Sequence, residues 1–209
     1  MKLVFVGVSG AGKGTQAKEI CSIYNIAHIS TGDILRSHIQ NKTELGLQVK
    51  EIMDSGKLVS DEIVIKLVQM RINEDDCKNG FILDGFPRTL SQAKMLDNIT
   101  DLDKVVYIKA DDEDIVKRLS GRLICEKCGS MYHKIYSKPK VNNICDNCGD
   151  SLIQRQDDKE ETVRERLRIF HEMTAPVIDF YRNKKLLAEV NGIGDIKEIT
   201  NSIVKALEE

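Results

Sequence analysis

Apolar positions along the chain follow two alternating patterns. Short apolar runs predict buried strands at residues 2–6, 81–84, 104–109 and 186–190, with a weaker one at 27–30. Apolar residues at intervals of three to four predict helices near residues 15–24, 32–40, 44–54, 61–74, 89–98, 112–120, 160–183 and 195–207. Strands separated by helices indicate an α/β fold in which helices flank a five-stranded parallel sheet. Such sheets bind ligands beyond the carboxyl ends of their strands.

Two segments do not fit this alternation. Residues 31–60 are helical and polar and contain no apolar run, and residues 121–158 contain four cysteines and little helical periodicity. We interpret both segments as subdomains inserted into the domain that carries the sheet. The length of 209 residues suits one domain with such insertions.

A glycine-rich segment, GVSGAGKGT at residues 7–15, joins the first predicted strand to the first predicted helix. In that context backbone N–H groups and a helix N-terminus bind phosphate, and Lys13 is expected to neutralise the β and γ phosphates. The alternative is a glycine-rich turn without a ligand. Gly14 departs from the pattern G-x-x-x-x-G-K-[ST], because it stands where Ser or Thr binds magnesium. We expect Thr15 or hydration water to take that role.

Two carboxylates are candidates for ordering magnesium through water. Asp84 ends a predicted strand beside the phosphate loop, and a carboxylate at that position holds magnesium or its waters in phosphoryl-transfer enzymes. Asp33 follows Ser30-Thr31-Gly32 and is the second candidate. The alternatives are a turn or capping role for Asp84 and the N-cap of the following helix for Asp33.

Three arginines are candidates for binding phosphate, since a guanidinium group forms two parallel hydrogen bonds with it. Arg88 follows the predicted strand end through a turn that contains proline, and Arg36 lies in the first inserted segment. For Arg36 alone, a surface charge is the default interpretation. Arg166 falls on the apolar stripe of the helix at 160–183. A cation on a buried stripe requires an anion, which is either a structural carboxylate or a nucleotide phosphate.

Four cysteines form two pairs, Cys125-x2-Cys128 and Cys145-x2-Cys148, separated by 16 residues. This spacing is typical of a zinc ribbon, in which four thiolates close the coordination sphere and the metal is structural. Disulfides are the alternative, and the spacing does not separate zinc from iron. Arg118 and Arg122 precede the segment and Arg155 follows its cysteines. A small metal-bound flap with arginines at both ends is expected to act as a lid over phosphates.

The charge balance limits the classes of partner. The net charge is −2 and the pI is about 6.1, which argues against nucleic-acid binding through bulk charge. The first apolar run is too short for a signal sequence or a membrane span. We therefore expect a cytoplasmic protein without a membrane partner, in a reducing compartment where cysteines bind metal rather than form disulfides.

These motifs together resemble adenylate kinases of the long bacterial type, which carry a zinc-binding lid. The matching segments follow the family's order over nearly the whole chain: 7–15, 30–36, 56–59, 83–88, 118–122, the four cysteines, 155–158, Arg166 and 173–176. The resemblance implies a P-loop kinase fold. Its parts are a CORE domain (residues 1–29, 60–120 and 159–209), an AMP-binding subdomain (30–59) and a zinc-binding LID (121–158).

The resemblance also implies the reaction ATP + AMP ⇌ 2 ADP, with magnesium, in a monomer. The residues that it assigns to phosphoryl transfer are Lys13, Arg88, Arg122, Arg155 and Arg166. Those expected to contact ATP are Gly10, Ala11, Gly12, Lys13, Gly14, Thr15, Arg118, Arg122, Met131, Tyr132 and Gly194. Those expected to contact AMP are Thr31, Arg36, Lys57, Leu58, Val59, Gly85, Phe86, Pro87, Arg88, Gln92, Arg155 and Arg166.

The chain departs from the family pattern at two positions. Leu123 stands where many relatives have a second arginine, so the lid carries one positive charge fewer, and Gly194 stands where many have lysine. Gln92 carries a donor and an acceptor on one amide, which matches the adenine edge and favours AMP over UMP or CMP. A kinase for a related nucleoside monophosphate remains an alternative.

A protein of another class is the second interpretation. Under this interpretation the metal ribbon binds nucleic acid, and the glycine loop binds a nucleotide that switches the protein between two states. The lysines of the ribbon are offset by acidic residues, and its aromatic residues are limited to Tyr132 and Tyr136. The sequence therefore favours the kinase.

Overall fold

Five parallel strands form the central sheet in the computed structural model, which describes residues 1–208. They are β1 (Lys2–Val6), β2 (Ala27–Ser30), β3 (Phe81–Asp84), β4 (Lys104–Lys109) and β8 (Leu187–Asn191). Their order is β2-β3-β1-β4-β8, and every neighbouring pair is parallel. The five-stranded parallel sheet predicted from the apolar runs is therefore confirmed, with the last strand beginning one residue later than expected.

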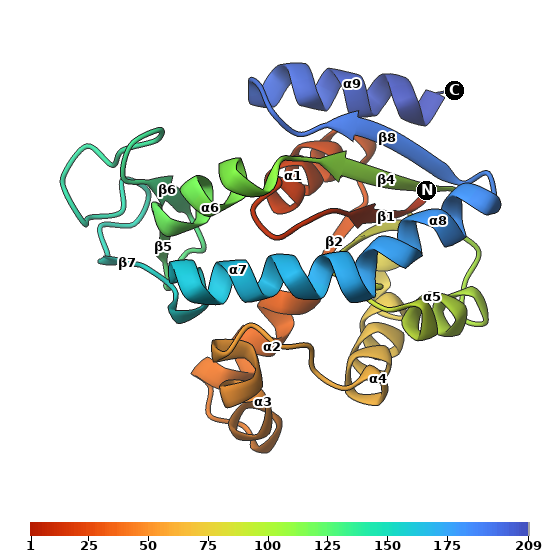
Figure 1. Cartoon of the computed structure of the whole chain (residues 1–209), viewed down its shortest axis with the longest axis horizontal. Helices are drawn as coiled ribbons and strands as arrows, with labels where there is room; N and C mark the ends of the chain where they lie inside the picture. The colour runs from red at the N-terminus through yellow and green to blue at the C-terminus, as the bar shows by residue number, and fades with distance from the viewer. Residues whose placement is uncertain (209) are drawn as a thin grey trace.

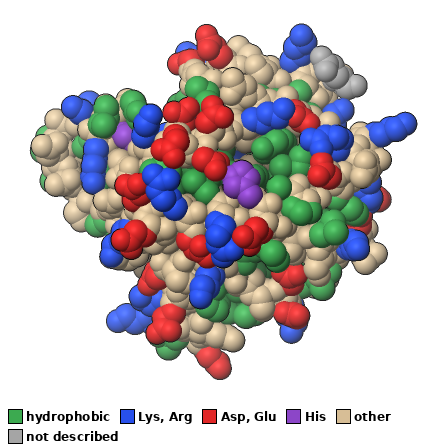
Figure 2. Space-filling view, viewed as in Figure 1, with side chains coloured by type: hydrophobic (Ala, Val, Ile, Leu, Met, Phe, Trp, Pro, Cys, Tyr) green, Lys and Arg blue, Asp and Glu red, His purple; other side chains and the backbone are tan. Residues whose placement is uncertain are grey.

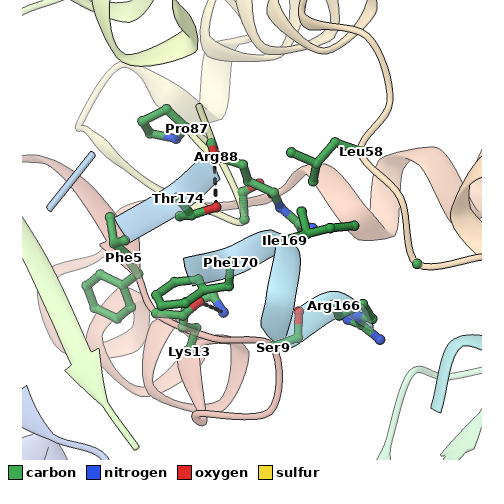
Figure 3. Close-up of a pocket in the computed structure, with 14 residues that line it drawn as sticks. Phe5, Ser9, Lys13, Leu58, Pro87, Arg88, Arg166, Ile169, Phe170 and Thr174 are labelled. Atoms are coloured by element: carbon green, nitrogen blue, oxygen red, sulfur yellow. Dashed lines mark hydrogen bonds between the residues drawn. The ribbon is translucent and has the colours of Figure 1, made fainter. Parts of the chain in front are cut away.

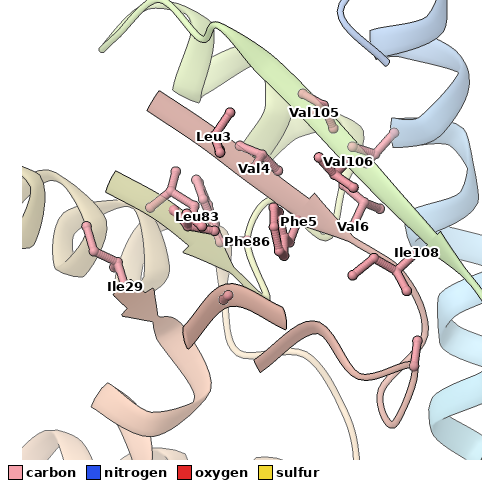
Figure 4. Packing of buried hydrophobic residues seen from close by; sticks show 14 of the residues in the cluster. Leu3, Val4, Phe5, Val6, Ile29, Leu83, Phe86, Val105, Val106 and Ile108 are labelled. Carbon is pink, nitrogen blue, oxygen red and sulfur yellow. The ribbon is translucent and has the colours of Figure 1, made fainter. Parts of the chain in front are cut away.

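The core lies on both faces of this sheet. Val4, Leu83, Val105 and Val106 are fully buried in the three central strands, and Ile29 of β2 is nearly so (Figure 4). Strands that are covered on both faces are apolar at consecutive positions. This is why they could be recognised in the sequence as short continuous runs rather than as an alternating pattern.

Helices cover the sheet on both sides. They are α1 (Lys13–Tyr24), α4 (Asp61–Ile72), α5 (Leu90–Asp97), α6 (Asp112–Ser120), α7 (Glu160–Ile169), α8 (Ala175–Asn183) and α9 (Ile196–Glu208). Figure 1 shows α9 beside β8 on one side and α7 and α8 crossing the opposite side. Short 3-10 turns lie at Asp75–Cys77 and Gln156–Asp158. Within residues 1–208, no helix combines the length and the apolar character needed to cross a membrane.

The first inserted segment forms two helices, α2 (Thr31–Gln40) and α3 (Glu44–Asp54), which pack against each other away from the sheet (Figure 1). Ser30 caps α2, because its hydroxyl accepts a hydrogen bond from the backbone N–H of Asp33 at 3.2 Å. Asp33 lies in the first turn of α2. The alternative that Asp33 caps this helix is therefore wrong.

The second inserted segment contains a sheet that the sequence did not predict. Strands β5 (Arg122–Cys125), β6 (Met131–His133) and β7 (Leu152–Ile153) form an antiparallel sheet in the order β6-β5-β7. Strands of two to four residues are too short to leave a periodic pattern. Leu123 is buried with Leu152, Cys125 and Cys145 in a small separate core. Leu123, which departs from the family pattern noted above, thus contributes to the packing of this small core.

The long helix predicted at 160–183 is divided by a π turn over Phe170–Thr174. There the backbone N–H of Ala175 donates to the carbonyl of Phe170, five residues earlier. Pro176 explains the turn, since its ring clashes with the carbonyl four residues before it in a regular α-helix and it has no N–H to donate. The apolar stripe continues through the turn, and Phe170, Thr174 and Tyr181 are all buried.

Replacing Tyr181 by phenylalanine is expected to stabilise the protein. The Tyr181 side chain is fully buried, and its hydroxyl has no hydrogen-bond partner among residues 1–208. Burial raises the pKa of this phenol, so the hydroxyl stays neutral. Removing an unpaired buried hydroxyl is expected to add about 1 kcal/mol to the free energy of unfolding. That gain corresponds to roughly 2–4 °C in Tm.

The prediction is tested by comparing the Tm of Tyr181→Phe with that of the wild type and of a control variant, Tyr132→Phe. The Tyr132 hydroxyl accepts a hydrogen bond from the backbone N–H of Asp146 at 2.8 Å. Tyr132→Phe removes this hydrogen bond and is therefore expected to have a lower Tm than the wild type. A lower Tm for Tyr181→Phe would contradict the prediction.

Candidate active site

The glycine-rich loop joins β1 to the N-terminus of α1, as the sequence predicted. Gly10 and Gly12 have positive φ angles of 90° and 95°, which favour glycine. A Cβ on Gly10 would lie 2.8 Å from the Leu119 side chain, so no larger residue fits. No side chain caps α1, which begins at Lys13 rather than Thr15. The N–H groups of its first turn are therefore left for an anion.

Lys13 folds back over this loop. Its ammonium donates to the carbonyls of Gly7 at 2.8 Å and Val8 at 3.0 Å. The pKa of Lys13 is lowered to about 8, mainly by burial; the charge of Asp84 opposes this shift, and the positive charges of Arg88 and Arg166 contribute to it. A lysine in such surroundings gains from a phosphate nearby, because the phosphate charge stabilises its protonated form.

Asp84 is the last residue of β3 and faces the start of α1. A Cβ on Gly14 would lie 3.3 Å from Asp84 Oδ2, so the carboxylate is next to the phosphate loop. His28 Nε2 lies 3.4 Å from the same oxygen, and this neighbour was not anticipated from the sequence. The position fits a carboxylate that orders magnesium or its water. The magnesium role of Asp84, and that of Asp33, stays a prediction.

Arg122 and Arg166 are held by two adjacent carboxylates, Asp157 and Asp158. Arg122 forms a two-pronged ion pair with Asp158, with distances of 2.8 Å and 2.6 Å. Arg166 donates to Asp157 Oδ2 at 2.8 Å and lies 3.6 Å from Asp158 Oδ1. In this structure carboxylates therefore supply the anion next to Arg166, and its contact with a nucleotide phosphate stays a prediction. Asp158 is fully buried. The sequence shows Asp158 three residues after Arg155, but it does not show which arginines pair with Asp158.

A second pair of arginines shares Asp33. Arg36 Nη2 donates to Asp33 Oδ1 at 2.6 Å, and Arg155 Nη2 lies 3.7 Å from the same oxygen. Burial alone would raise the pKa of Asp33, but Arg36 and Arg155 outweigh burial and lower it. The Nε of Arg36 is buried without a partner among the described residues. This unpaired donor indicates a missing acceptor at the site.

Arg88 keeps both terminal guanidinium nitrogens free of hydrogen bonds within residues 1–208. Its Nε donates to the carbonyl of Gly85 at 2.8 Å, and its own carbonyl accepts from the Thr174 hydroxyl at 2.8 Å (Figure 3). Burial lowers the pKa of Arg88 to about 10, and the charge of Arg166 adds to the effect. The backbone of Arg88 is therefore fixed, while its charge has no carboxylate partner among these residues.

Two adjoining cavities receive these side chains. The first is lined by the phosphate loop, Lys13, Pro87, Arg88, Arg166 and Phe170 (Figure 3). The second adjoins it and contains nine of the twelve residues predicted to bind AMP: Thr31, Arg36, Lys57, Leu58, Val59, Gly85, Arg88, Gln92 and Arg166. The geometry thus brings together residues from four separate segments of the chain. Their contacts with a nucleotide stay predictions.

Some predicted site residues have side chains engaged elsewhere. Phe86 is 1% exposed in the hydrophobic core, which leaves only its backbone for a ligand. The Tyr132 hydroxyl lies 3.7 Å from Cys145 Sγ. Arg118 donates to the carbonyl of Gly192 at 3.1 Å, two residues before Gly194. The structure therefore brings Arg118 to the loop that contains Gly194, and it directs Tyr132 toward the cysteines.

The four cysteines of the lid converge into one cluster. Their sulfur atoms all lie within 4.8 Å of one another, with Cys125 3.4 Å from Cys148 and Cys128 3.5 Å from Cys145. A tetrahedral zinc site with Zn–S bonds of about 2.3 Å places its sulfurs roughly 3.8 Å apart. Each Cys-x2-Cys pair is followed directly by a glycine with positive φ, Gly129 after the first pair and Gly149 after the second. The cluster fits a structural zinc ion, and among residues 1–208 no disulfide is formed.

Acidic and basic side chains are interspersed on the face shown in Figure 2. The site differs from this surface. At the site, six basic side chains lie close to only four carboxylates. The basic residues are Lys13, Arg36, Arg88, Arg122, Arg155 and Arg166. The carboxylates belong to Asp33, Asp84, Asp157 and Asp158. Such an excess of partly buried positive charge is suited to a polyanion.

Comparison with known proteins agrees with this geometry. The family model described as adenylate kinase matches residues 5–186. An adenylate kinase of Acetivibrio thermocellus is 52% identical over 212 residues, which cover 99% of this chain and 98% of that protein. Adenylate kinases of Caldicellulosiruptor saccharolyticus and Listeria monocytogenes are each 51% identical, with 99% of both chains covered. The chain belongs to the adenylate kinase family of phosphotransferases.

Proposed function

We propose that this site transfers a phosphoryl group from ATP to AMP, forming two molecules of ADP. The observation that carries the proposal is that Lys13, Arg36, Arg88 and Arg166 line adjoining cavities beside the phosphate loop. Arg122 pairs with Asp158 and Arg155 lies near Asp33, so both are held close to these side chains. Two nucleotides bring a large negative charge that these side chains can neutralise. ATP is expected at the loop, and AMP in the cavity between α2, α3 and the start of α5.

The protein acts mainly by alignment and charge stabilisation, because phosphoryl transfer requires little covalent chemistry from the enzyme. Lys13 and the first turn of α1 would hold the donor phosphates. Arg88 and Arg36 would hold the AMP phosphate in line with the transferred group. Arg122, Arg155 and Arg166 would exchange their carboxylate partners, in part, for phosphate oxygens.

Magnesium would be held through water by Asp84 and Asp33, together with oxygens of the donor phosphates, and would neutralise charge on the phosphates. The lid of residues 121–158, stabilised by a zinc ion on its four cysteines, would close over ATP and exclude water. We further propose that the enzyme acts as a cytoplasmic monomer, independently of nucleic acid and membranes.

ATP binding is expected to become pH-dependent near pH 8. Lys13 has a pKa lowered to about 8 in the ligand-free protein, so it loses its proton as the pH rises through this value. Phosphate raises that pKa again, so ATP binding should take up close to one proton between about pH 8 and 10. Calorimetry in buffers of different ionisation enthalpy measures this uptake. Proton uptake that is zero at both pH 7 and pH 9 would contradict the prediction.

An acceptor series tests the proposed function. The purified protein is supplied with ATP, magnesium and, separately, AMP, GMP, IMP, UMP or CMP, and nucleoside diphosphates are quantified. We expect AMP to be the preferred acceptor. Transfer to UMP or CMP but not to AMP would favour a kinase for another nucleoside monophosphate, and no transfer to any acceptor would overturn the proposal.

A further inference from the structure

The side-chain amide of Gln92 is fixed at both ends. Its Oε1 accepts a hydrogen bond from the backbone N–H of Arg88 at 2.7 Å, and its Nε2 donates to Asp61 Oδ1 at 2.7 Å. A backbone N–H can only donate, and an ionised carboxylate can only accept. The two partners therefore define which end of the amide is oxygen and which is nitrogen. The residue is 2% exposed and lines the cavity expected to bind AMP.

Asp61 is the first residue of α4, and both of its carboxylate oxygens serve this arrangement. Its Oδ2 accepts from the Thr89 hydroxyl at 3.0 Å, and that hydroxyl accepts from the backbone N–H of Gln92 at 3.0 Å. No lysine or arginine within residues 1–208 forms an ion pair with Asp61. The carboxylate thus joins the start of α4 to the start of α5 and holds the amide between them.

The orientation of this amide determines which base it can pair with. The amide has one further N–H and one further lone pair on its oxygen, a donor beside an acceptor. The 6-aminopurine edge offers an N6–H donor and an N1 acceptor. The 6-oxopurine edge offers an O6 acceptor and an N1–H donor, in the reverse order. An amide rotated by 180° would therefore suit the 6-oxopurine.

That rotation is opposed at both ends. It would direct the Gln92 NH2 group at the N–H of Arg88, and the amide oxygen at the carboxylate of Asp61. Each contact would bring groups of like polarity together in a buried site, where an unmade hydrogen bond costs about 1–3 kcal/mol. Discrimination based on a site's fixed hydrogen-bonding groups is strong for this reason.

We propose that Asp61 is a specificity-determining positioning residue. It holds the Gln92 amide in the orientation that accepts a 6-aminopurine monophosphate and rejects a 6-oxopurine monophosphate. The inference rests on the proposed function, in which Gln92 contacts the acceptor base. Asp61 itself acts through Gln92 rather than by touching the nucleotide.

Replacing Asp61 by alanine tests the proposal, with AMP and IMP as alternative acceptors and ATP as donor. We expect the ratio of kcat/KM for AMP to that for IMP to fall by about tenfold or more, mainly through a higher KM for AMP. The KM for ATP should change by less than about twofold, because Asp61 does not face the donor. Asp61→Asn retains an acceptor oxygen and should keep the ratio within about threefold of wild type.

Glu62→Ala is the matched control, since it removes an exposed carboxylate from the same first turn of α4 without touching Gln92. It should leave the acceptor ratio unchanged. Asp61→Leu gives a second variant that has no acceptor oxygen and a strong helix-forming residue, should Asp61→Ala fail to fold. An unchanged AMP to IMP ratio in whichever of these two variants is folded would overturn the inference.

Gln92→Leu separates this inference from the proposed function. If Gln92→Leu loses the discrimination between AMP and IMP while the Asp61 variants keep it, the role of Asp61 alone is wrong. If Gln92→Leu leaves the kinetics with both acceptors unchanged, Gln92 does not contact the base and the premise fails with it.

Discussion

Replacing Arg88 by alanine, or Lys13 by methionine, is expected to reduce turnover by about 10²-fold or more. Both side chains line the same cavity, and neither is neutralised by an ion pair with a carboxylate within residues 1–208. Removing one preorganised charge-stabilising donor typically costs 10²–10³ in kcat. Steady-state measurement of ADP formation from ATP and AMP gives the turnover of each variant.

Arg168→Ala is the control for these substitutions. Arg168 is exposed on α7 and pairs with Glu165 and Glu172, so it tests the loss of an arginine outside the site. We expect it to retain wild-type turnover. Folded Arg88→Ala or Lys13→Met protein with near-wild-type turnover would show that the residue does not stabilise the transferred group.

Removing the metal from the lid is expected to destabilise the protein strongly. Cys125 and Cys145 lie in the small core formed with Leu123 and Leu152, Cys148 packs against it and Cys128 is exposed, so without an ion the two cysteine pairs lose their central cross-link. Structural zinc contributes about 10–16 kcal/mol of binding free energy in zinc-finger peptides. We expect chelation, or Cys128→Ser, to lower Tm by roughly 10 °C or more, with elemental analysis reporting zinc before and after treatment.

Cys21→Ala is the control for the metal prediction, because Cys21 lies in α1, outside the cluster. It should leave the metal content unchanged and alter Tm only slightly. Protein that contains no metal as purified, yet melts at the same temperature with and without added zinc, would contradict the structural role of the ion. Iron in place of zinc would change the identity of the metal but not its role.

Local patterns were sufficient for the parts of the site that are contiguous in the chain. The glycine loop, the strand that ends at Asp84 and the two cysteine pairs are each set by a few neighbouring residues. The π turn could have been inferred from Pro176, whose lack of an N–H is incompatible with a continuous helix at that point. That signal was present in the sequence and was missed.

The partners of the site residues could not be predicted from such patterns. Arg122 pairs with Asp158 across 36 positions, and Gln92 pairs with Asp61 across 31. Contacts of this kind are decided by how α4, α5 and the lid meet in the folded chain, and no local periodicity encodes them. The sequence indicated that Arg166 needed an anion, but the choice of Asp157 and Asp158 required the tertiary structure.

The most direct test of the central claim supplies ADP and magnesium as the only substrates. Because the proposed transfer is reversible, the enzyme should convert ADP into equal amounts of ATP and AMP. ³¹P NMR measures both products over time. Lys13→Met should form them at least about 10²-fold more slowly. Inorganic phosphate as a product, or no ATP from ADP, would contradict phosphoryl transfer between two adenine nucleotides at this site.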